Sequence, residues 1–454
     1  MVDFIRERFV GKSVVLLGFG REGQASYALL RRAFPEKQLA IADGNELIGE
    51  NPLIVADEHL DLILGSGFLD RISGYDVIIR SPGIPVWQLA CQGQITSQTE
   101  LFLQRYSAQV IGITGTKGKS TTSSLIHHIL KTAGTDVLLA GNIGNPVFHF
   151  IDLITPSTKI VFELSSHQLE YLSVAPHISV LLNLYQEHLD AYRSYGDYQL
   201  AKVNIAKYQQ EDDFLIYNLD DKLVKGHVQA YAGIRKSFPF SVVAEPQPGS
   251  FIRDGWICFS DGLNVLPVWK IHQDRFLRGE HNLKNILAAV SAAMICGVDP
   301  EMIEDGIATF KGLEHRLEYV GEFGNIHFYN DSIATIPEAC MEALKAIPNV
   351  DTLIAGGFDR GIDYQGLSDF LAGSSVRNFI LAGIAGKRIG EYLKGRNLEG
   401  KKLFYITRFD DFRDIAFRET RPGNSCLLSP AAASYDEFRN FEERGKRFRE
   451  LVRQ

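Results

Sequence analysis

The sequence predicts an α/β protein built from three consecutive units. A chain of 454 residues is too long for one ordinary hydrophobic core. Short runs rich in valine and isoleucine alternate with helical stretches, which is typical of βαβ units with parallel sheets. Glycine-rich turns directly follow two of these runs. We therefore expect three α/β domains joined by short linkers.

The first unit begins with a strand, a tight turn and a helix. Residues 13–17 form a buried strand, residues 18–23 the turn Gly-Phe-Gly-Arg-Glu-Gly, and residues 25–32 an amphipathic helix. A second strand at residues 39–42 ends at Asp43, about 20 residues further on, which completes the dinucleotide-binding pattern. This pattern predicts a nucleotide-binding unit without specifying the nucleotide. Taken alone, it favours NAD and a dehydrogenase.

A second glycine-rich turn lies in Ile111-Gly-Ile-Thr-Gly-Thr-Lys-Gly-Lys-Ser-Thr-Thr122, between a β-branched run and a helix with a basic end. Gly115 and Gly118 allow the backbone to curl so that successive N–H groups point at an anion. Lys119 adds a mobile positive charge, and Ser120 offers a hydroxyl to a magnesium ion. The stretch predicts a site for nucleotide phosphates.

This turn departs from the usual P-loop at one position. The usual pattern has glycine five residues before Gly118, where this chain has Ile113. The shifted glycines indicate a particular subfamily of nucleotide enzymes. A glycine-rich turn that binds no ligand is the alternative, and Gly-Lys-Ser-Thr between a strand and a helix argues against it.

Polar residues follow two apolar strands of the second unit. Glu163 ends the run at residues 159–163, and Asn183 ends the run at residues 178–183, with His188 shortly after. Open parallel sheets place their sites at the carboxyl ends of strands. Glu163, His188 and Ser120 together would suit a magnesium ion. The alternatives are a capping role for Glu163 and a structural role for His188.

The remaining pattern completes the second and third units. Residues 238–271 are rich in aromatic residues and glycine and predict a small antiparallel excursion, and residues 282–296 predict a closing helix. In the third unit, strands are predicted at residues 350–355, 378–382 and 425–429, separated by helical stretches. The third unit therefore repeats the βαβ pattern.

Three charged residues carry no signal of their own. Lys202 has the pattern of an ordinary lysine on a helix surface. Arg316 lies where the second unit meets the third, where it could clamp a phosphate. Asp331 follows the strand-like residues 326–329, where it could bind a ribose hydroxyl. The local pattern does not distinguish these three residues from ordinary surface residues.

Composition excludes several classes of protein. The net charge of −8 and the lack of a long basic stripe argue against nucleic-acid binding. The longest apolar stretch, residues 285–298, is too short to span a bilayer, and residues 1–8 have no apolar signal core. Five scattered cysteines without a C-x-x-C pair suit reduced thiols in the cytoplasm. We expect a cytoplasmic protein that binds neither nucleic acid nor membrane.

With these pieces in order, the whole chain resembles the Mur ligase family. The shared motifs are Gly115-Thr-Lys-Gly-Lys-Ser-Thr121, Ala140-Gly-Asn-Ile-Gly144, Glu163-Leu-Ser-Ser-His-Gln-Leu-Glu170, Glu187-His-Leu-Asp190, Gly279-Glu-His-Asn282, His315-Arg316, Asn330-Asp-Ser332, Gly356-Gly357 and Leu428-Ser-Pro-Ala-Ala-Ala-Ser434. Two further motifs, Ser81-Pro-Gly-Ile-Pro85 and Asn440-Phe-Glu-Glu-Arg-Gly445, favour the branch that adds D-glutamate.

The resemblance implies three domains and one reaction. A UDP-binding Rossmann-like domain would occupy residues 1–106, a P-loop-type ATPase domain with a mostly parallel sheet residues 107–312, and an amino-acid-binding Rossmann-like domain residues 313–454. ATP would convert the carboxylate of UDP-N-acetylmuramoyl-L-alanine to an acyl phosphate, which the amine of glutamate attacks. The ligands would be small molecules, and we expect a monomer because three domains complete the site.

The resemblance also implies a role for each site residue. The catalytic residues would be Lys119, His188 and Lys202. ATP would contact Gly115, Thr116, Lys117, Gly118, Lys119, Ser120, Thr121, Asn282, Arg316 and Asp331. Magnesium would bind Ser120, Glu163, His188 and Lys202. The UDP-linked substrate would bind Gly18, Gly20, Arg21, Gly23, Asp43, Ser81, Asn142, Ser165 and Gln168. Glutamate would bind Thr335, Arg360, Ser434 and Phe441.

The resemblance changes the interpretation of Lys202 most. In this family the matching lysine is carbamylated by CO₂, which turns a cation into a carboxylate-like ligand for a second magnesium ion. Two other positions depart from the family pattern: Ile333 stands where a lysine is usual, and Arg360 where a lysine is common. A planar guanidinium is not equivalent to an ammonium, so the handedness of the glutamate stays open.

Four alternatives to the D-glutamate ligase remain open. The same ligation with L-glutamate and another Mur-type ligase, such as a folylpolyglutamate synthase, use the same chemistry. The UDP-type first unit argues against the folylpolyglutamate synthase. An NAD-dependent dehydrogenase would explain the first glycine turn but not the second. A regulatory nucleotide-binding protein would not need Glu163, His188 and Lys202.

Overall fold

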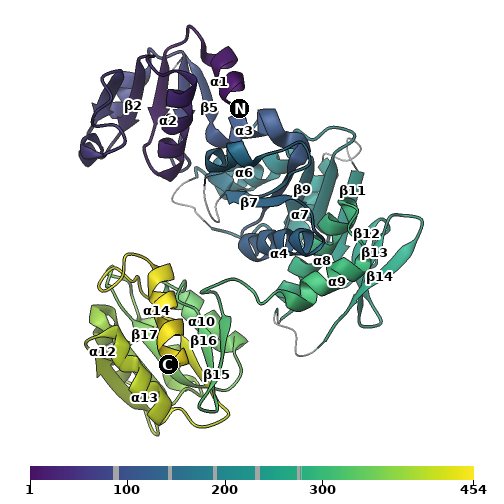
Figure 1. The fold of residues 1–454 in the computed structure, drawn as a ribbon. Coiled ribbons are helices and arrows are strands. Elements are labelled where there is room, and N and C mark those ends of the chain that lie inside the picture. The colour runs from purple at the N-terminus through teal and green to yellow at the C-terminus, as the bar shows by residue number, and fades with distance from the viewer. Residues whose placement is uncertain (85–91, 142–145, 188–191, 231–235, 273–276, 278) are drawn as a thin grey trace. The chain divides into compact units, whose positions relative to one another are not determined.

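The computed structural model describes residues 1–84, 92–141, 146–187, 192–230, 236–272, 277 and 279–454. The chain forms two compact units: one comprises Met1–Arg275 and Glu280–Phe310, the other Lys311–Gln454 with the stretch Phe276–Gly279. Each predicted domain holds one β-sheet, and helices lie against each sheet (Figure 1). The predicted α/β class is confirmed. The boundaries at residues 106 and 312 stay a prediction.

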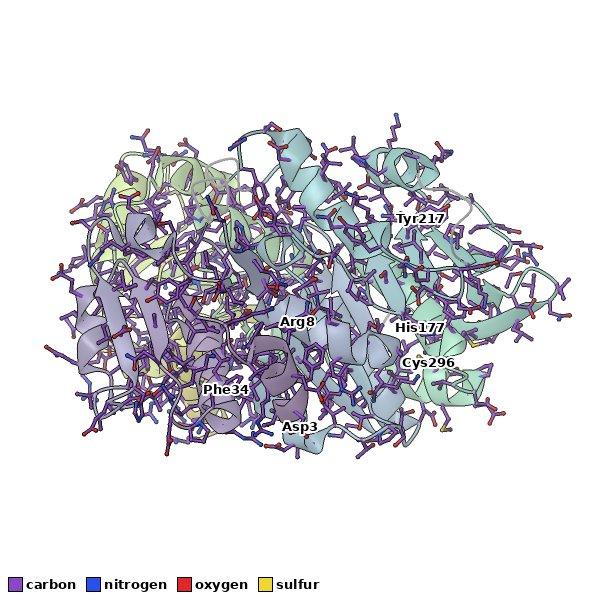
Figure 2. All side chains as sticks on the ribbon, turned by 90° about the horizontal axis from the view of Figure 1, so that it is seen from above. Asp3, Arg8, Phe34, His177, Tyr217 and Cys296 are labelled. Carbon is purple, nitrogen blue, oxygen red and sulfur yellow. The ribbon has the colours of Figure 1, made fainter. Side chains whose placement is uncertain are left out.

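The first sheet is wholly parallel, and its order in the described residues is β3-β2-β1-β4-β5. Its strands are β1 (Val14–Leu17), β2 (Leu39–Asp43), β3 (Leu60–Leu64), β4 (Val77–Arg80) and β5 (Gln94–Ser97). Its helices are α1 (Val2–Phe9), α2 (Arg21–Ala33) and α3 (Gln98–Tyr106). Helix α1 packs on α2, and Asp3 and Arg8 of α1 and Phe34 after α2 are labelled in Figure 2.

The second sheet has the order β14-β13-β12-β11-β10-β9-β6-β8-β7 in the described chain. Its strands are β6 (Val110–Thr114), β7 (Val137–Gly141), β8 (Lys159–Glu163), β9 (Ile178–Leu181), β10 (Phe214–Asn218), β11 (Lys236–Ser241), β12 (Gly249–Arg253), β13 (Trp256–Ser260) and β14 (Val265–Lys270). Strands β7 to β12 pair in parallel, and β12–β13–β14 are antiparallel. The predicted antiparallel excursion is therefore confirmed.

Helices surround this second sheet. They are α4 (Lys119–Thr132), α5 (Ser166–Leu169), α6 (Tyr195–Lys207), α7 (Lys222–Ala230), α8 (Glu280–Ile295) and α9 (Pro300–Thr309). Every residue of β6 is buried, as a central strand covered on both faces requires. Strand β6 lies between β8 and β9, so the strand order reverses there. Open parallel sheets bind their ligands at the carboxyl ends of the strands beside such a reversal.

The third sheet has the order β15-β16-β20-β17-β18-β19 within the described residues, and only its edge strand β15 is antiparallel. The strands are β15 (Glu318–Phe323), β16 (Ile326–Asn330), β17 (Val350–Gly356), β18 (Asn378–Ala382), β19 (Lys402–Ile406) and β20 (Ser425–Leu428). The helices are α10 (Pro337–Ala346), α11 (Gln365–Gly373), α12 (Gly383–Lys394), α13 (Phe412–Glu419) and α14 (Phe441–Arg453). The predicted third βαβ unit is confirmed.

Apolar side chains from the strands and the facing helices fill each of these cores. Five short 3₁₀ helices complete the described elements: Glu46–Glu50, Phe68–Ile72, Ser107–Gln109, Val147–Leu153 and Phe409–Asp411. No helix in the described ranges has the length and apolar character needed to cross a membrane. The four described cysteines are free thiols.

Candidate functional site

The second glycine turn connects β6 directly to α4. Gly118 caps the helix with a left-handed φ of 85°. A Cβ atom added there would lie 2.5 Å from Oδ1 of Asn285, and one added to Gly115 would lie 2.8 Å from Cβ of Leu182. Backbone N–H groups in the first helical turn have no partner within the helix and attract an anion. Both glycines therefore have a steric reason to be glycine.

Two lysines bind the same backbone atom of this turn. Nζ of Lys119 donates to the carbonyl oxygens of Gly115 and Thr116 at 2.9 and 3.0 Å, and Nζ of Lys202 donates to Gly115 O at 2.9 Å. The Lys202 side chain is only 2% exposed and lies 4.9 Å from the Tyr198 ring centre. The prediction from pattern that Lys202 is a surface lysine is wrong, because α6 turns this residue toward the sheet.

Burial changes the chemistry of the Lys202 amine. Desolvation, and then the charge of Lys119, lower its pKa from 10.5 to about 7, while Glu187 and Glu163 partly oppose that shift. About half of the amine is neutral near pH 7, where a surface lysine would be almost fully charged. A neutral amine is nucleophilic, so this side chain can react at physiological pH.

Glu163 lies at the carboxyl end of β8, beside Ile113 of β6 in the parallel register. Its side chain is fully buried, and Oγ of Ser123 is 3.5 Å from Oε2. Ser120 is half-buried in the first turn of α4. Oxygen donors of this kind suit Mg²⁺, which takes one or two carboxylates and completes its shell with phosphates and water. The donor set here fits a magnesium ion.

Two predicted residues, Asn142 and His188, lie outside the described residues. Among the residues that are described, no group of three His, Cys, Asp or Glu side chains could hold a metal ion by itself. Glu163 and Ser120 are thus the described members of the predicted magnesium set that carry oxygen donors.

A hydrogen-bond network holds Thr116 and Lys117 of the second glycine turn in place. Oγ1 of Thr116 lies 2.9 Å from the hydroxyl of Tyr198 and accepts from the N–H of Tyr185 at 2.9 Å. The amide of Asn183 bonds both backbone groups of Lys117, at 2.8 and 2.9 Å. No sequence pattern singles out Tyr198, which the fold brings to Thr116 from 82 residues away.

The exposed side of the turn carries an ion pair. Nζ of Lys117 lies 2.7 Å from Oε1 of Glu187, and the Lys117 side chain is 68% exposed. Thr121, also predicted to contact ATP, is buried in the first turn of α4. The turn thus presents Lys117 to solvent and encloses Lys119.

Ser165 and Gln168 form a capping box at the start of α5. Gln168 Oε1 accepts from the N–H and the hydroxyl of Ser165 at 2.9 and 3.1 Å. Gln168 Nε2 donates to Oε1 of Glu22 at 2.7 Å. The Gln168 amide therefore links the central sheet to the first glycine turn, a role that the sequence did not suggest.

The Glu22 carboxyl is largely removed from water. Burial raises its pKa from 4.5 to about 7, against the opposing effects of the Gln168 hydrogen bond and the charge of Arg80. Arg80 itself is buried and donates to the carbonyl oxygens of Ile84 and His167 at 2.7 and 2.6 Å. Glu22 of α2 and Arg80 of β4 thus contact the residues around α5.

The first glycine turn is packed tightly against β4. Gly18 has a φ of 89°, and its carbonyl accepts from Oγ of Ser81 at 2.9 Å. A Cβ atom on Gly23 would lie 2.2 Å from the same carbonyl oxygen. Oδ2 of Asp43 accepts from the N–H of Phe19 at 2.8 Å. Asp43, at the end of β2, therefore fixes the backbone of the turn.

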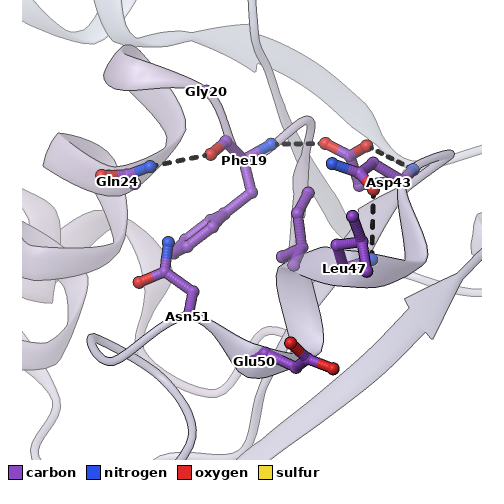
Figure 3. Close-up of a pocket in the computed structure, with 9 residues that line it drawn as sticks. Phe19, Gly20, Gln24, Asp43, Leu47, Glu50 and Asn51 are labelled. Carbon is purple, nitrogen blue, oxygen red and sulfur yellow. Dashed lines mark hydrogen bonds between the residues drawn. The ribbon is translucent and has the colours of Figure 1, made fainter.

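A hollow of about 450 Å³ opens beside this turn (Figure 3). Phe19, Gly20 and Asp43 line one part of it, and Leu47 and Asn51 another. Helix α2 begins with the exposed Arg21 and Gly20 as its N-cap, so its positive end lies at the hollow. Of the predicted residues, Gly20 and Asp43 line the hollow. Gly18, Gly23 and Ser81 contact one another in the turn beside it.

Asn282 lies in the first turn of α8, next to the phosphate turn. Its Oδ1 accepts from Nδ2 of Asn285 at 3.1 Å. Asn285 in turn packs against Gly118. The fold thus brings Asn282 near Gly115–Thr121, as an ATP contact would need.

Arg316 and Asp331 belong to the second compact unit. The buried Asp331 carboxylate accepts from Oγ of Ser429 at 2.8 Å and from the N–H of Leu317 at 3.2 Å. Burial raises its pKa from 3.8 to about 7, and these bonds and the charge of Arg316 oppose the shift. Arg316 is exposed.

Three of the four predicted glutamate positions, Thr335, Arg360 and Ser434, fall on loops that follow strands of the third sheet, and the fourth, Phe441, is the first residue of α14. Nη2 of Arg360 donates to the Thr335 carbonyl at 3.0 Å, so these two residues are adjacent. Ser434 is buried in the loop after β20, and Phe441 begins α14. The carbonyl of Phe441 accepts from Oγ of Ser332 at 2.8 Å.

Helix α14 is set close to His315. Oδ1 of its N-cap, Asn440, accepts from the N–H of Glu443 at 2.8 Å. A Cβ atom on Gly445 would lie 2.2 Å from Nδ1 of His315, whose φ is 62°. Only glycine allows the helix to approach this ring so closely.

The chain matches known proteins over nearly its whole length. Residues 113–293 match the family model described as the Mur ligase middle domain. The UDP-N-acetylmuramoylalanine--D-glutamate ligase of Acetivibrio thermocellus is 36% identical over 403 residues, 86% of this chain and 85% of that protein. The ligase of the same name from Listeria monocytogenes is 35% identical over 457 residues, 98% of this chain and 97% of that protein.

Solved structures show the same fold at low sequence identity. MurF from Acinetobacter baumannii has a TM-score of 0.62 at 17% identity and aligns over 97% of this chain and 93% of its own. MurF from Thermotoga maritima, solved in complex with ADP, has a TM-score of 0.56 at 15% identity over 97% and 95%. The multi-domain fold is shared with both.

Proposed function

The chain belongs to the Mur ligase family, and on that premise we propose that it joins glutamate to UDP-N-acetylmuramoyl-L-alanine at the expense of ATP. The relatives that match its full length bear the name of this ligase, which supports D-glutamate as the amino acid. The reaction would supply a precursor for peptidoglycan. No comparison supports a dehydrogenase.

The proposed reaction has two steps. The substrate carboxylate attacks the γ-phosphorus of ATP, the bond to the bridging oxygen breaks, and ADP leaves with an acyl phosphate formed. The glutamate amine then attacks the acyl carbon, loses a proton, and the tetrahedral intermediate expels phosphate to give the amide. A carboxylate is a poor electrophile at neutral pH, so this activation is what makes the amide accessible.

The protein contributes position and charge to both steps. We assign the ATP phosphates to Gly115–Thr121, where the start of α4 and the Lys119 ammonium offset their charge. Asn282 would contact the nucleotide from α8. Arg316 and Asp331 are the two further residues that we assign to the nucleotide.

We assign magnesium to Ser120, Glu163, His188 and a carbamylated Lys202. Bound there, the ion would neutralise charge on the transferred phosphoryl group. The support for the carbamate is the burial of Lys202 and its pKa of about 7. A neutral Nζ can add to the carbon of CO₂ and lose a proton, which leaves an anionic carbamate.

We assign the UDP moiety to the hollow at Gly18–Gly23 with Asp43 and Ser81. The path from there to the phosphates would pass Asn142, Ser165 and Gln168. Glutamate would bind Thr335, Arg360, Ser434 and Phe441. We further propose a monomer in the cytoplasm, because one chain supplies every assigned residue and ATP is available there.

One observation carries the proposal: a buried lysine and a phosphate-turn lysine share the Gly115 carbonyl near a buried glutamate. Phosphate release from ATP, measured with UDP-N-acetylmuramoyl-L-alanine and either D- or L-glutamate, tests it. We expect turnover with D-glutamate. Turnover with L-glutamate alone would reassign the amino acid, and no turnover with either would overturn the proposal. NADH oxidation in the same tube would instead support a dehydrogenase.

A further inference from the structure

Arg444 in α14 is a buried arginine whose hydrogen bonds go to backbone carbonyls and one hydroxyl. Its side chain is 2% exposed, and no carboxylate lies within ion-pair distance among the residues that the structure describes. Burial lowers its pKa from 12.5 to about 10, although the charge of Asp436 opposes that shift. Burying an unpaired guanidinium is costly, so its hydrogen bonds must compensate.

The guanidinium makes four hydrogen bonds, three of them to backbone carbonyls. Nε donates to Oγ of Ser332 at 3.0 Å and Nη2 to the Ser332 carbonyl at 2.8 Å. Nη2 also donates to the Ala432 carbonyl and Nη1 to the Ala433 carbonyl, both at 3.1 Å. The arginine therefore joins the loop after β16 to the loop after β20.

A third segment is tied to the same cluster. Oγ of Ser332 donates to the carbonyl of Phe441, the first residue of α14. The Ala433 carbonyl also accepts from the N–H of Phe358, after β17, at 3.0 Å. Thr335, Ser434 and Phe441, three of the four assigned glutamate positions, lie on the segments that this cluster connects.

The hydrogen bonds from Arg444 to the Ala432 and Ala433 carbonyls also set the direction of the N–H groups that follow them. In a trans peptide the C=O of one residue and the N–H of the next point in opposite directions. Since Arg444 draws in the carbonyls of Ala432 and Ala433, the N–H groups of Ala433 and Ser434 point away from it. The Ser434 N–H has no acceptor in the described part of the chain, although Ser434 is buried. Such an N–H is available to an anion.

We propose that Arg444 is a positioning residue for the amino-acid substrate, which holds the loop at Ala432–Ser434 so that the Ser434 N–H faces the carboxylate of glutamate. This inference rests on the proposed function. Arg444 itself does not touch the substrate; it acts through the backbone that it orients.

Arginine suits this task better than lysine. Its planar fork offers five donors in a fixed geometry, whereas a lysine ammonium is a single point on a flexible stem. The space around the fork is also tight, because a Cβ atom on Gly357 would lie 2.4 Å from the Ala433 oxygen and 3.1 Å from Nη1 of Arg444. Arg444→Lys therefore keeps the charge and removes the geometry.

The test measures the KM of each substrate for Arg444→Lys. We expect the KM for glutamate to rise about tenfold or more, as for loss of buried charged hydrogen bonds. The KM values for ATP and the UDP-linked substrate should stay within about twofold. Arg447→Lys is the matched control, because Arg447 lies one turn away on α14 and pairs with Asp410 at the surface. Its three KM values should not change.

A partial reaction separates this inference from the proposed function. Hydroxylamine traps an acyl phosphate made from ATP and the UDP-linked substrate without glutamate. Arg444→Lys should form the hydroxamate at the wild-type rate. A wild-type protein that forms neither hydroxamate nor amide would refute the proposed function instead.

A second variant covers the case in which Arg444→Lys does not fold. Ser332→Ala removes the Nε bond and the contact with Phe441 but keeps the guanidinium. It should also raise the glutamate KM selectively. An unchanged glutamate KM in the folded variant, or an equal rise in all three KM values, would overturn the role of Arg444.

Discussion

Lys119 and Lys202 donate hydrogen bonds to one and the same carbonyl oxygen, that of Gly115, each at 2.9 Å. Two ammonium groups this close repel each other, and the charge of Lys119 contributes to the lowered pKa of Lys202. The shared oxygen offsets part of that repulsion. The pair is thus poised for an anionic ligand or for loss of the Lys202 charge.

Lys202→Ala should reduce ligation by more than about a hundredfold, because it would remove a metal ligand rather than an outer-shell contact. If the carbamate is correct, acetate or formate should restore part of the activity by replacing the missing carboxylate. Phosphate release with and without these anions measures both effects.

Lys207→Ala is the control for this experiment, because Lys207 is the exposed last residue of the same helix. It should retain full activity and show no response to formate. Full activity of Lys202→Ala without added anion would remove the carbamate from the mechanism.

Gly118→Ala should raise the KM for ATP about tenfold or more, because the new Cβ would meet Asn285 and shift the N–H groups that face the phosphates. Gly134→Ala is matched for backbone strain, since Gly134 has a φ of 75° but no atom within 4 Å of an added Cβ. Both should lose about 1–2 kcal/mol of stability. An equal KM for ATP in the two variants would argue against the assignment of the ATP phosphates to this turn.

Asp43→Ala should raise the KM for the UDP-linked substrate and leave the KM for ATP unchanged. The substitution removes the acceptor for the Phe19 N–H, so the backbone of the first glycine turn is no longer held in place. Leaving that N–H unsatisfied should cost about 1–3 kcal/mol of folding stability. Asp61→Ala on the neighbouring strand β3, where the side chain is exposed, should change neither value. A selective rise in the KM for ATP would contradict the assignment of this turn to UDP.

Glu22→Gln should stabilise the protein at pH 8 but not near pH 4.5. The folded pKa of about 7 lies above the unfolded 4.5, so folding takes up a proton between these values. The contribution of this carboxyl to the free energy of unfolding is therefore full below pH 4.5 and is lost as the pH rises through about 7. Glutamine stays neutral and avoids that loss, on the order of 1–3 kcal/mol.

Urea denaturation near pH 4.5 and at pH 8 measures this difference. Glu36→Gln, at an exposed carboxylate of the same unit, should show the same stability as wild type at both values. If Glu22→Gln is no more stable than wild type at pH 8, the Glu22 carboxyl is better solvated than its contacts indicate.

The sequence predicted what local pattern encodes. Gly118 needs a positive φ, and the apolar run before it with polar residues after it defines a strand, a turn and a helix without knowledge of the rest of the chain. Glu163 could be placed for the same reason, since a strand's carboxyl end is visible in its sequence.

Contacts between distant segments could not be predicted this way. The burial of Lys202, the bond between Glu22 and Gln168, and the four contacts of Arg444 each join residues through the folded sheets. A lysine on a helix or an arginine near the end of the chain has the same local pattern whether it is buried or exposed. Family resemblance gave Lys202 a role, whereas Glu22 and Arg444 lay within recognised motifs without a role of their own.

The close approach of Gly445 to His315 bears on how relatives of this chain should be interpreted. In Asn440-Phe-Glu-Glu-Arg-Gly445, Asn440 caps α14, Arg444 donates hydrogen bonds to two loops, and Gly445 allows the helix to pack closely on the His315 ring. These three residues meet requirements of folding and packing, and none of them determines which amino acid is bound. Relatives that keep the motif are therefore expected to share this packing, and we expect differences in their amino-acid substrate to arise at other positions, such as Ile333 and Arg360.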